Sequence, residues 1–329
     1  MKKAVCSGYY GFDNFGDDAV LKVLVDGFSK KYNLTVFSAN PSKTSALYDV
    51  KSVYSFDYAT VLSEIKKADV LISGGGSLLQ DSTSLKSLLY YLLLIYFAIL
   101  YRKEIIIFSQ GMGPFKRWIS RFLVKNALKN CSKITVRDYH SKELLESWGI
   151  NSSLVCDPVF SIPVKNKTKN GKLGIQLRSS NIISEHFLDN LASVINKEFN
   201  DTTIILYSLQ DNLDLNICKS FAEKLNSKNV IIKNNLTIDE VIDELSELEF
   251  LISMRFHAAL IGLKAGVKVL PIAYDPKVEI LARNSNIQYI NPVDYKNLVN
   301  LVKQLKTIDT KQTQEFIKKQ YFEFNVFDK

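Results

Sequence analysis

Short runs of apolar residues alternate with longer stretches of helical periodicity along most of the chain. The runs lack a strict apolar–polar alternation, as at 105–108, which is typical of parallel strands covered on both faces. In the first half, strands are predicted at 3–7, 34–38, 69–73, 104–109 and 133–136, and helices at 18–31, 84–101, 116–129 and 139–148. This order predicts a Rossmann-like α/β domain over residues 1–162.

A polar, turn-rich segment at 163–172 interrupts the pattern and is predicted to be an interdomain linker. The alternation then restarts, with strands predicted at 173–177, 203–207, 230–233, 250–253 and 268–272. One helix should begin at Thr237, because Glu240 follows at capping-box spacing, and a last helix is predicted at 310–321. Residues 172–329 are therefore expected to form a second Rossmann-like domain. Two such domains should face each other across a cleft.

Composition and charge narrow the function classes. Hydrophobic residues make up 47% and charged residues 23%, as in a folded globular protein. The net charge is +8, and residues 1–160 hold most of the excess, with 20 Lys and Arg against 14 Asp and Glu. No basic block is interleaved with aromatics, so a nucleic-acid partner is not expected. An anionic small substrate or an anionic membrane surface is favoured instead.

The cysteines and the apolar stretches indicate a cytoplasmic protein. Cys6, Cys131, Cys156 and Cys218 are scattered, and none forms a C-x-x-C pair, so reduced thiols are expected. The N-terminus looks like a first strand and lacks the apolar stretch of a signal peptide. The apolar run at 88–100 is shorter than the about 20 residues that span a bilayer, so it is predicted to be a buried helix.

Three predicted strands of the first domain end in glycine-rich loops, at 7–18, 73–81 and 109–114. Glycine lets the backbone adopt positive φ, and loop amides beside a helix N-terminus attract anions. Gly8, Gly11 and Gly16 do not have the dinucleotide spacing, and no G-K-[ST] of a P-loop is present. Enzymes that use nicotinamide or ATP are therefore unsupported. A strand–helix turn would explain one such loop, but three at one sheet edge favour a ligand site.

Cationic side chains also follow predicted strands. Arg137 follows the strand at 133–136, with Asp138 as the expected helix cap, and Arg178 follows the strand at 173–177. Arg255 and His257 follow the strand at 250–253, where open α/β sheets bind ligands. A fixed cation beside an acid–base group suggests an anionic substrate and a proton transfer. A surface ion pair is the alternative for each cation taken alone.

Other chemistry has no support in the sequence. His140 and His186 lie inside predicted helices without a chemical neighbour, so structural roles are expected for them. No cluster has metal-ligand spacing, and no nucleophile motif such as G-x-S-x-G appears. We therefore expect neither a metal nor a cofactor.

Taken together in their order, the motifs resemble the polysaccharide pyruvyl transferase family, in particular its CsaB-type members of bacterial cell-wall assembly. The resemblance covers residues 4 to about 280. Phe256 stands where leucine is expected, and Asp18 where glutamate is usual. The matching segments are Gly8-Tyr9-Tyr10-Gly11, Asn14, Gly16-Asp17-Asp18, Gly74-Gly75-Gly76-Ser77-Leu78-Leu79-Gln80-Asp81, Gln110-Gly111-Met112-Gly113-Pro114, Val136-Arg137-Asp138, Met254-Arg255-Phe256-His257-Ala258 and Tyr274-Asp275-Pro276-Lys277-Val278.

The resemblance implies a GT-B-like pair of Rossmann domains and a transfer of the enolpyruvyl unit of phosphoenolpyruvate onto two sugar hydroxyls, with release of phosphate. Phosphoenolpyruvate would be a co-substrate, and a lipid-linked sugar would be the acceptor. His257 is assigned as the general acid, and Arg255, Arg137 and Lys277 as ligands of the phosphoenolpyruvate anion. The remaining expected substrate-binding residues are Gly8, Tyr9, Tyr10, Gly11, Asn14, Asp17, Gly75, Gly76, Ser77, Gln80, Asp81, Gln110, Gly111 and Arg178.

Several alternatives stay open. Asp17 or Asp81 would serve as the base for a hydroxyl, although helix capping is the favoured role for Asp17. A GT-B glycosyltransferase that uses a nucleotide sugar is the main rival function, and a non-catalytic glycan-binding scaffold is a third. The predicted helix from Lys116 carries Arg117, Arg121 and Lys125 on one stripe. This stripe is either an ordinary solvated helix face or a site of peripheral contact with an anionic membrane.

Overall fold

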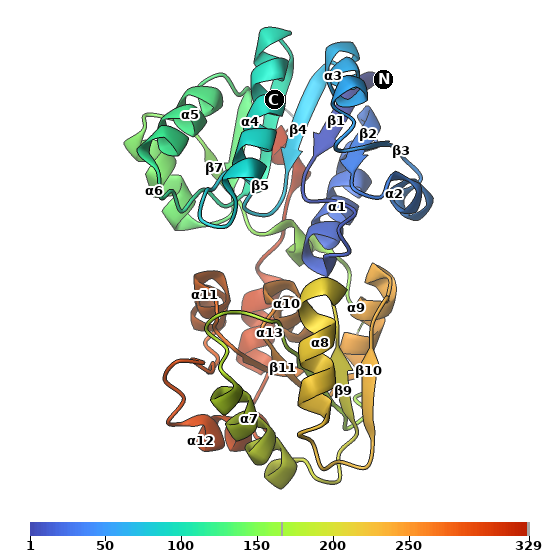
Figure 1. Cartoon of the computed structure of the whole chain (residues 1–329), viewed down its shortest axis with the longest axis vertical. Helices are drawn as coiled ribbons and strands as arrows, with labels where there is room; N and C mark the ends of the chain where they lie inside the picture. Colours follow the sequence, from blue (N-terminus) through green and yellow to red (C-terminus); the bar gives the residue numbers. More distant parts are fainter. Residues whose placement is uncertain (166, 328–329) are drawn as a thin grey trace. The chain divides into compact units, whose positions relative to one another are not determined.

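The computed structural model describes residues 1–165 and 167–327 and divides the chain into two compact units (Figure 1). Unit 1 contains Met1–Ile162 together with the chain from Tyr321 onward, and unit 2 contains Pro163–Gln320. The second domain predicted for 172–329 therefore ends at Gln320, because the last segment of the chain belongs to unit 1.

Unit 1 is built on a parallel sheet of seven strands in the order β3-β2-β1-β4-β5-β6-β7. This is the strand order of a Rossmann fold, with its topological switch point between β1 and β4. The strands are β1 Lys2–Ser7, β2 Tyr32–Ser38, β3 Lys51–Tyr54, β4 Val70–Gly74, β5 Glu104–Gln110, β6 Lys133–Val136 and β7 Ser153–Leu154.

Helices cover both faces of this sheet. They are α1 Phe15–Phe28, α2 Pro41–Tyr48, α3 Tyr58–Lys67, α4 Leu85–Leu100, α5 Trp118–Leu128, α6 Tyr139–Ser147 and the short 3₁₀ helix η1 Pro158–Ser161. In unit 1, the elements α2, β3, α3 and β7 were not predicted from the sequence. Only Thr44 is buried in α2 and only Val53 in β3, so these two elements lack the apolar periodicity that identifies the others, whereas α3 buries Val61 and Ile65.

One core of unit 1 lies between the sheet and helices α3, α4, α5 and α6. The C-terminal segment packs elsewhere in unit 1, where the ring of Phe322 contacts Phe108 and the ring of Phe324 contacts Phe28. Ser161 Oγ donates a hydrogen bond to the carbonyl of Phe322 at 3.0 Å. Phe322 is 1% exposed, so the end of the chain completes a core of unit 1.

Unit 2 is also a Rossmann-like α/β unit. Its parallel sheet has the order β10-β9-β8-β11-β12, so its switch point lies between β8 and β11. The strands are β8 Leu173–Gln176, β9 Ile204–Tyr207, β10 Val230–Lys233, β11 Phe250–Ser253 and β12 Lys268–Pro271. The helices are α7 Glu185–Glu198, α8 Asp211–Ala222, α9 Ile238–Glu247, α10 Phe256–Lys264, α11 Pro276–Asn284, α12 Leu298–Leu305 and α13 Lys311–Lys318.

Local signals set the helix ends that place the functional loops. The capping box at the start of α9 is confirmed, since Glu240 N donates to Thr237 Oγ1 and Thr237 N donates to Glu240 Oε2 at 2.7 Å. Asp138 caps α6 as expected, accepting from Ser141 N at 2.7 Å. The helix predicted at 310–321 is shorter, because the chain leaves unit 2 after Gln320.

Candidate active site

The first two glycine-rich loops of unit 1 meet at its topological switch point. They follow β1 and β4, and Ser7, the last residue of β1, lies beside Ser73, the last but one residue of β4. The hydroxyl of Tyr10 donates to the carbonyl of Gly74 at 3.0 Å and so ties one loop to the other. Gly76 has a φ of +71°, and a Cβ there would approach Asp17 Oδ1 to 2.9 Å. Glycine thus lets the second loop approach the start of α1.

Several predicted substrate ligands are engaged in holding these loops. Tyr10 and Gln110 are buried, and Gln110 Nε2 donates to Ser73 Oγ at 2.9 Å. Tyr9 is partly buried, and its ring stacks on Phe12 at 4.1 Å between centroids. Gln80 Oε1 accepts a bond from Ser82 N at 2.7 Å within its own loop. These side chains give the loops a defined shape, and their predicted contact with substrate stays a prediction.

The expected capping role of Asp17 is wrong. Helix α1 begins at Phe15, and Asn14 is its cap, accepting from Gly16 N at 3.2 Å. Asp17 lies inside the first turn, where Asn14 Nδ2 donates to its carboxylate. The next residue, Asp18, accepts from Gly11 N at 3.4 Å. Burial and the neighbouring Asp17 carboxylate raise the pKa of Asp18 to about 7.

Asp81 has a structural role in unit 1. It is 3% exposed and accepts bonds from the amides of Lys116 at 2.5 Å and Arg117 at 3.0 Å, at the entry to α5. Burial acts to raise the pKa of Asp81, but these donors and the Arg117 charge outweigh it and hold the pKa below its usual value. An ionised carboxylate already shared between two amides is a weak candidate for the catalytic base.

Arg137 is the predicted cationic site residue of unit 1. Its Nη1 lies 2.7 Å from Asp157 Oδ2, and its Nη2 donates to Ser77 Oγ at 3.3 Å. Ser77 is exposed, and a Cβ on Gly111 would come within 2.7 Å of Ser77 Oγ. The structure therefore brings together predicted site residues from the loops after β4, β5 and β6.

In unit 2, candidate side chains follow three neighbouring strands. The ends of β8 and β11 are in register at Gln176 and Ser253, and β12 lies on the other side of β11. Arg178 comes two residues after β8, and Arg255 two residues after β11. His257 is the second residue of α10, partly buried, with its ring edge-on to Phe256. The carboxyl edge of this sheet thus carries the predicted acid–base residue.

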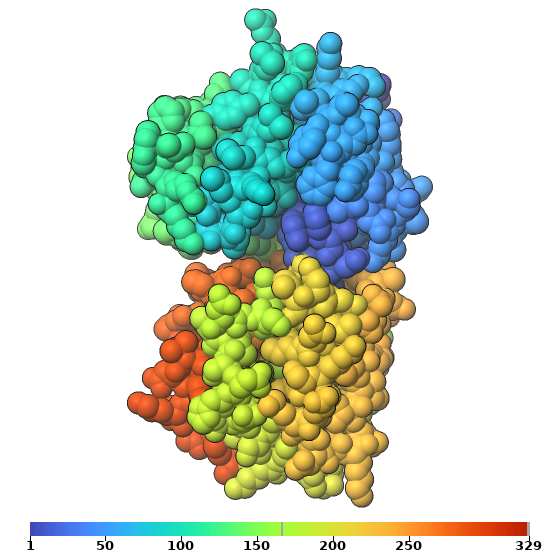
Figure 2. Space-filling view, viewed as in Figure 1, coloured from blue at the N-terminus to red at the C-terminus, as the bar shows by residue number. Residues whose placement is uncertain are grey.

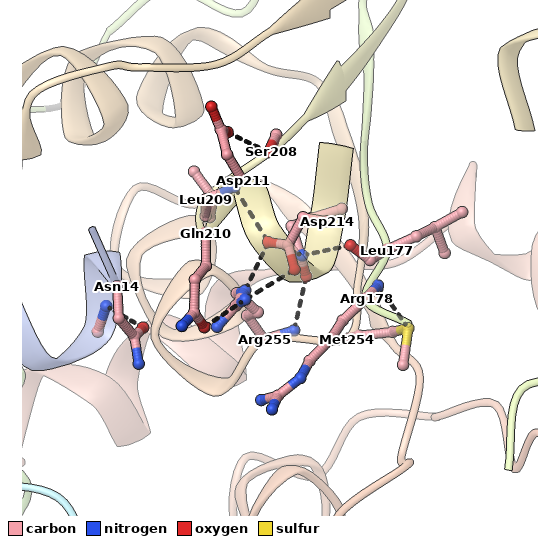
Figure 3. Close-up of polar contacts among 12 residues, drawn as sticks. Asn14, Leu177, Arg178, Ser208, Leu209, Gln210, Asp211, Asp214, Met254 and Arg255 are labelled. Carbon is pink, nitrogen blue, oxygen red and sulfur yellow. Dashed lines mark hydrogen bonds and ion pairs between the residues drawn. The ribbon is translucent and has the colours of Figure 1, made fainter. Parts of the chain in front are cut away.

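The guanidinium of Arg255 is held by a buried carboxylate that the sequence analysis did not identify. Arg255 Nε lies 2.8 Å from Asp214 Oδ2, and Nη2 lies 2.7 Å from Asp214 Oδ1, which is bidentate geometry (Figure 3). Nη2 also donates to Gln210 Oε1 at 3.0 Å. Asp214 is fully buried and Arg255 is 7% exposed. This ion pair holds Arg255, the N-cap of α10, in place.

Asp214 collects bonds from several elements. It accepts from Gln176 Nε2 at the end of β8 and from Leu209 N before α8. Gln176 Oε1 in turn accepts from Arg255 N at 2.8 Å. A sequence signal for this role exists. Asp214 shares the buried stripe of α8 with Ile217, Cys218 and Phe221, and a carboxylate on an apolar stripe indicates a buried partner.

Arg178 and Lys277 are more accessible than Arg255 among the candidate cations of unit 2. Arg178 Nη1 donates to the hydroxyl of Tyr274 at 3.2 Å, and its guanidinium lies 5.7 Å from the centre of that ring. In Figure 3 its guanidinium extends away from Asp214. The side chain of Lys277 is 45% exposed and lies 3.6 Å from Asp275, the cap of α11. Arg178 is therefore joined to the Tyr274–Lys277 motif by direct contact.

His140 and His186 are exposed on α6 and α7. His186 contacts Asn190 and Tyr295 of its own unit. Among the described residues, no group of three His, Cys, Asp or Glu side chains is arranged to hold a metal ion.

Solved structures share the architecture across nearly the whole chain. The co-structure of S. aureus MnaA with UDP has a TM-score of 0.69 at 11% identity and covers 100% of this chain and 94% of its own. The UDP-GlcNAc 2-epimerase from Neisseria meningitidis has a TM-score of 0.65 at 10% identity, with 99% and 96% covered. Anabaena HepE with UDP and glucose has a TM-score of 0.65 at 9% identity, with 100% and 98% covered. These likenesses identify a GT-B-like fold of parallel α/β units.

The sequence matches one protein family over most of its length. No curated protein matches the sequence. The model of the polysaccharide pyruvyl transferase family matches residues 14–276, which include the second and third glycine-rich loops, Arg137, Arg178, Arg255 and His257. The chain therefore belongs to the polysaccharide pyruvyl transferase family, a family of transferase enzymes.

Proposed function

We propose that this protein transfers the enolpyruvyl unit of phosphoenolpyruvate onto two hydroxyls of a sugar in a cell-surface polysaccharide precursor. The products are a cyclic ketal and inorganic phosphate. Family membership supports the reaction class. The observation that carries the proposal is the grouping of Arg178, His257 and Lys277 after three neighbouring strands of unit 2.

The charges at this edge suit the proposed donor. Phosphoenolpyruvate carries a carboxylate and a phosphate, and guanidinium groups bind both in a bidentate way. We assign Arg178 and Lys277 to this anion, because both are partly accessible. The assignment of Arg137 to this anion, made from the sequence, stays a prediction.

Arg255 takes a different role in this proposal from the one expected from the sequence. Its guanidinium is paired bidentately with buried Asp214, and its main chain precedes the first turn of α10. We therefore assign Arg255 as a positioning residue that fixes His257, two residues later. A buried guanidinium that makes two hydrogen bonds to a carboxylate keeps the start of α10 rigid, and the general acid His257 lies there.

His257 is the proposed general acid. Its imidazolium would protonate the methylene carbon of phosphoenolpyruvate, which becomes the methyl group and leaves an oxocarbenium-like centre at C2. The first sugar hydroxyl attacks C2, and its proton restores the imidazolium. The second hydroxyl then displaces phosphate, which carries away the second proton. No oxidant, reductant or metal is required for this balance.

Phosphate release from phosphoenolpyruvate tests the assignment. The first acceptor to try is the one that the resemblance to CsaB-type members implies, a lipid-linked disaccharide that contains N-acetylmannosamine. His257→Ala and His257→Gln should lower kcat by about 10²–10⁴-fold, because general acid catalysis contributes that much. His186→Ala is the matched control, since His186 is an exposed histidine of the same unit. Equal turnover by wild type and His257→Ala would show that His257 is not the acid.

Thermal shifts separate the rival functions. Phosphoenolpyruvate should raise Tm, and UDP-sugars should not, because a ligand stabilises only the protein that binds it. The reverse result would favour a glycosyltransferase that uses a nucleotide sugar. A shift with phosphoenolpyruvate but no phosphate release with any acceptor would favour a non-catalytic binding role.

A further inference from the structure

Helix α4 has two apolar faces, although the sequence analysis predicted a buried helix. One face packs in the core of unit 1. The other carries a stripe spaced by three or four residues, as on one side of a helix. Its members are Leu85 (37% exposed), Leu89 (48%), Leu93 (38%), Tyr96 (36%) and Leu100 (70%). Exposed apolar side chains in a continuous row mark an interaction site more often than scattered ones do.

Helix α5 extends this stripe. The hydroxyl of Tyr96 on α4 donates to the carbonyl of Leu123 on α5 at 3.0 Å, so the two helices are neighbours. Trp118 is 76% exposed, Ile119 51% and Phe122 57%. We call these residues, together with the stripe of α4, the α4–α5 apolar surface. Figure 1 shows α4 and α5 next to each other in unit 1, and Figure 2 shows the outer side of α4 uncovered.

The charge around this surface is strongly one-sided. Residues 82–137 contain ten Lys and Arg and a single acidic residue, Glu104. Glu104 lies 3.9 Å from Lys2, a further cation. Exposed cations stand at both ends of α4, at Lys86 and Arg102, and along α5 at Arg121 and Lys129. This segment therefore carries an excess of nine positive charges, more than the whole chain's +8.

We propose that the α4–α5 apolar surface docks on an anionic lipid bilayer. Leucine side chains would enter the acyl boundary, Trp118 and Tyr96 would lie at the headgroup level, and the surrounding cations would meet anionic headgroups. The inference rests on the proposed function in one respect: an enzyme with a lipid-linked acceptor would meet that acceptor at a membrane surface. Charge selects this occupant over a second copy of the chain, because a two-fold contact would place like charges against each other.

Within the described part of the chain, every helix is too short or too polar to span a bilayer. The proposed docking is peripheral, through side chains on the surface of α4 and α5. Binding of this kind depends on both the apolar side chains and the cations. It should therefore weaken with salt and with neutral lipid, as screening of exposed charges requires.

Co-sedimentation of the full chain with vesicles tests the proposal. Vesicles of phosphatidylcholine and phosphatidylglycerol in equal parts should retain the protein at low ionic strength, and vesicles of phosphatidylcholine alone should not. The double variant Trp118→Ser, Phe122→Ser should bind more than about tenfold more weakly, since two exposed aromatic side chains leave the interface. Ile231→Ser and Ile280→Ser are matched controls, because both side chains are exposed in unit 2.

Charge reversal gives a second arm. Lys86→Glu with Lys129→Glu should reduce retention, whereas Lys197→Glu on α7 should not, although all three are exposed. Failure of wild type to bind anionic vesicles, or equal binding by wild type and the aromatic double variant, would overturn the proposal. So would a wild-type dimer that the double variant converts to a monomer, with no vesicle binding by either. Vesicles without acceptor require no turnover, so this result is independent of phosphate release.

Discussion

Replacing Asp214 with alanine would leave the guanidinium of Arg255 buried without its two charge-assisted hydrogen bonds. Both partners lie within unit 2, with Asp214 fully buried and Arg255 7% exposed. Removing one partner of a buried ion pair costs about 3–5 kcal/mol, because the other charge stays desolvated. Gln176 Nε2 and Leu209 N also lose their acceptor. We therefore expect the free energy of unfolding of unit 2 to fall by about this amount.

Hydrogen exchange followed by mass spectrometry suits this measurement, because each unit is read separately. Both tryptophans, Trp118 and Trp148, lie in unit 1, so their fluorescence does not report on unit 2. Peptides from β8 and β11 should exchange between about 10² and 10⁴ times faster in Asp214→Ala, at about 1.4 kcal/mol per factor of ten. Peptides from β1 and β4 should be unchanged.

Two further variants sharpen the result. Asp243→Ala is the matched control, since Asp243 is an aspartate of unit 2 whose side chain is 57% exposed beside Lys167, and its loss should cost less than about 1 kcal/mol. Asp214→Leu combined with Arg255→Met should recover much of the lost protection, because it leaves no charge buried. Exchange in Asp214→Ala equal to that of wild type would refute the reasoning.

Two other predictions concern the polar groups of the candidate site. The raised pKa of Asp18 means that the folded state holds its proton more tightly than the unfolded state, so wild-type stability should fall by on the order of 1 kcal/mol per pH unit between 3.8 and about 7 and level off above. Tryptophan fluorescence in urea should show this slope missing in Asp18→Asn, and a slope shared by both proteins would contradict it. Arg178→Lys should raise KM for phosphoenolpyruvate by about tenfold with less effect on kcat, because it loses the bidentate fork. Arg283→Lys on α11 is the control, and an unchanged KM in Arg178→Lys would remove Arg178 from the site.

Buried elements could be predicted from the sequence because a buried strand or helix face requires a run or a periodic pattern of apolar residues. β6, β10 and β11 were predicted with the bounds that they have, and the strand–helix alternation gave the Rossmann-like units. The stretch from α2 to α3 was missed because it buries few side chains. The C-terminal segment was assigned to unit 2 because its position along the chain says nothing about where its aromatic rings pack.

The site was predictable to the extent that strand ends carry it. Arg178, Arg255 and His257 were found because parallel strands bring their carboxyl ends to one sheet edge. The separate roles of Arg178 in substrate binding and of Arg255 in positioning could not be predicted, because they depend on which cation is paired with a carboxylate in the folded chain. Asp214 lies 41 residues before Arg255, and no spacing rule connects a helix carboxylate to a distant loop. Only the three-dimensional structure, in which Asp214 of α8 is bonded to Arg255 and to Gln176 of β8, reveals the pair.

The return of the chain to unit 1 at Tyr321 has a consequence for biosynthesis. Unit 2 is one continuous segment, whereas unit 1 needs residues from both ends of the chain. When the chain has been synthesised as far as Gln320, all residues of unit 2 are present. At that point Phe28 and Phe108 of unit 1 still lack the ring contacts that Phe324 and Phe322 provide. Residues that complete unit 1 are therefore synthesised after all of unit 2, although most of unit 1 is synthesised first. A nascent chain lacking its last residues carries a finished unit 2 and an unfinished unit 1.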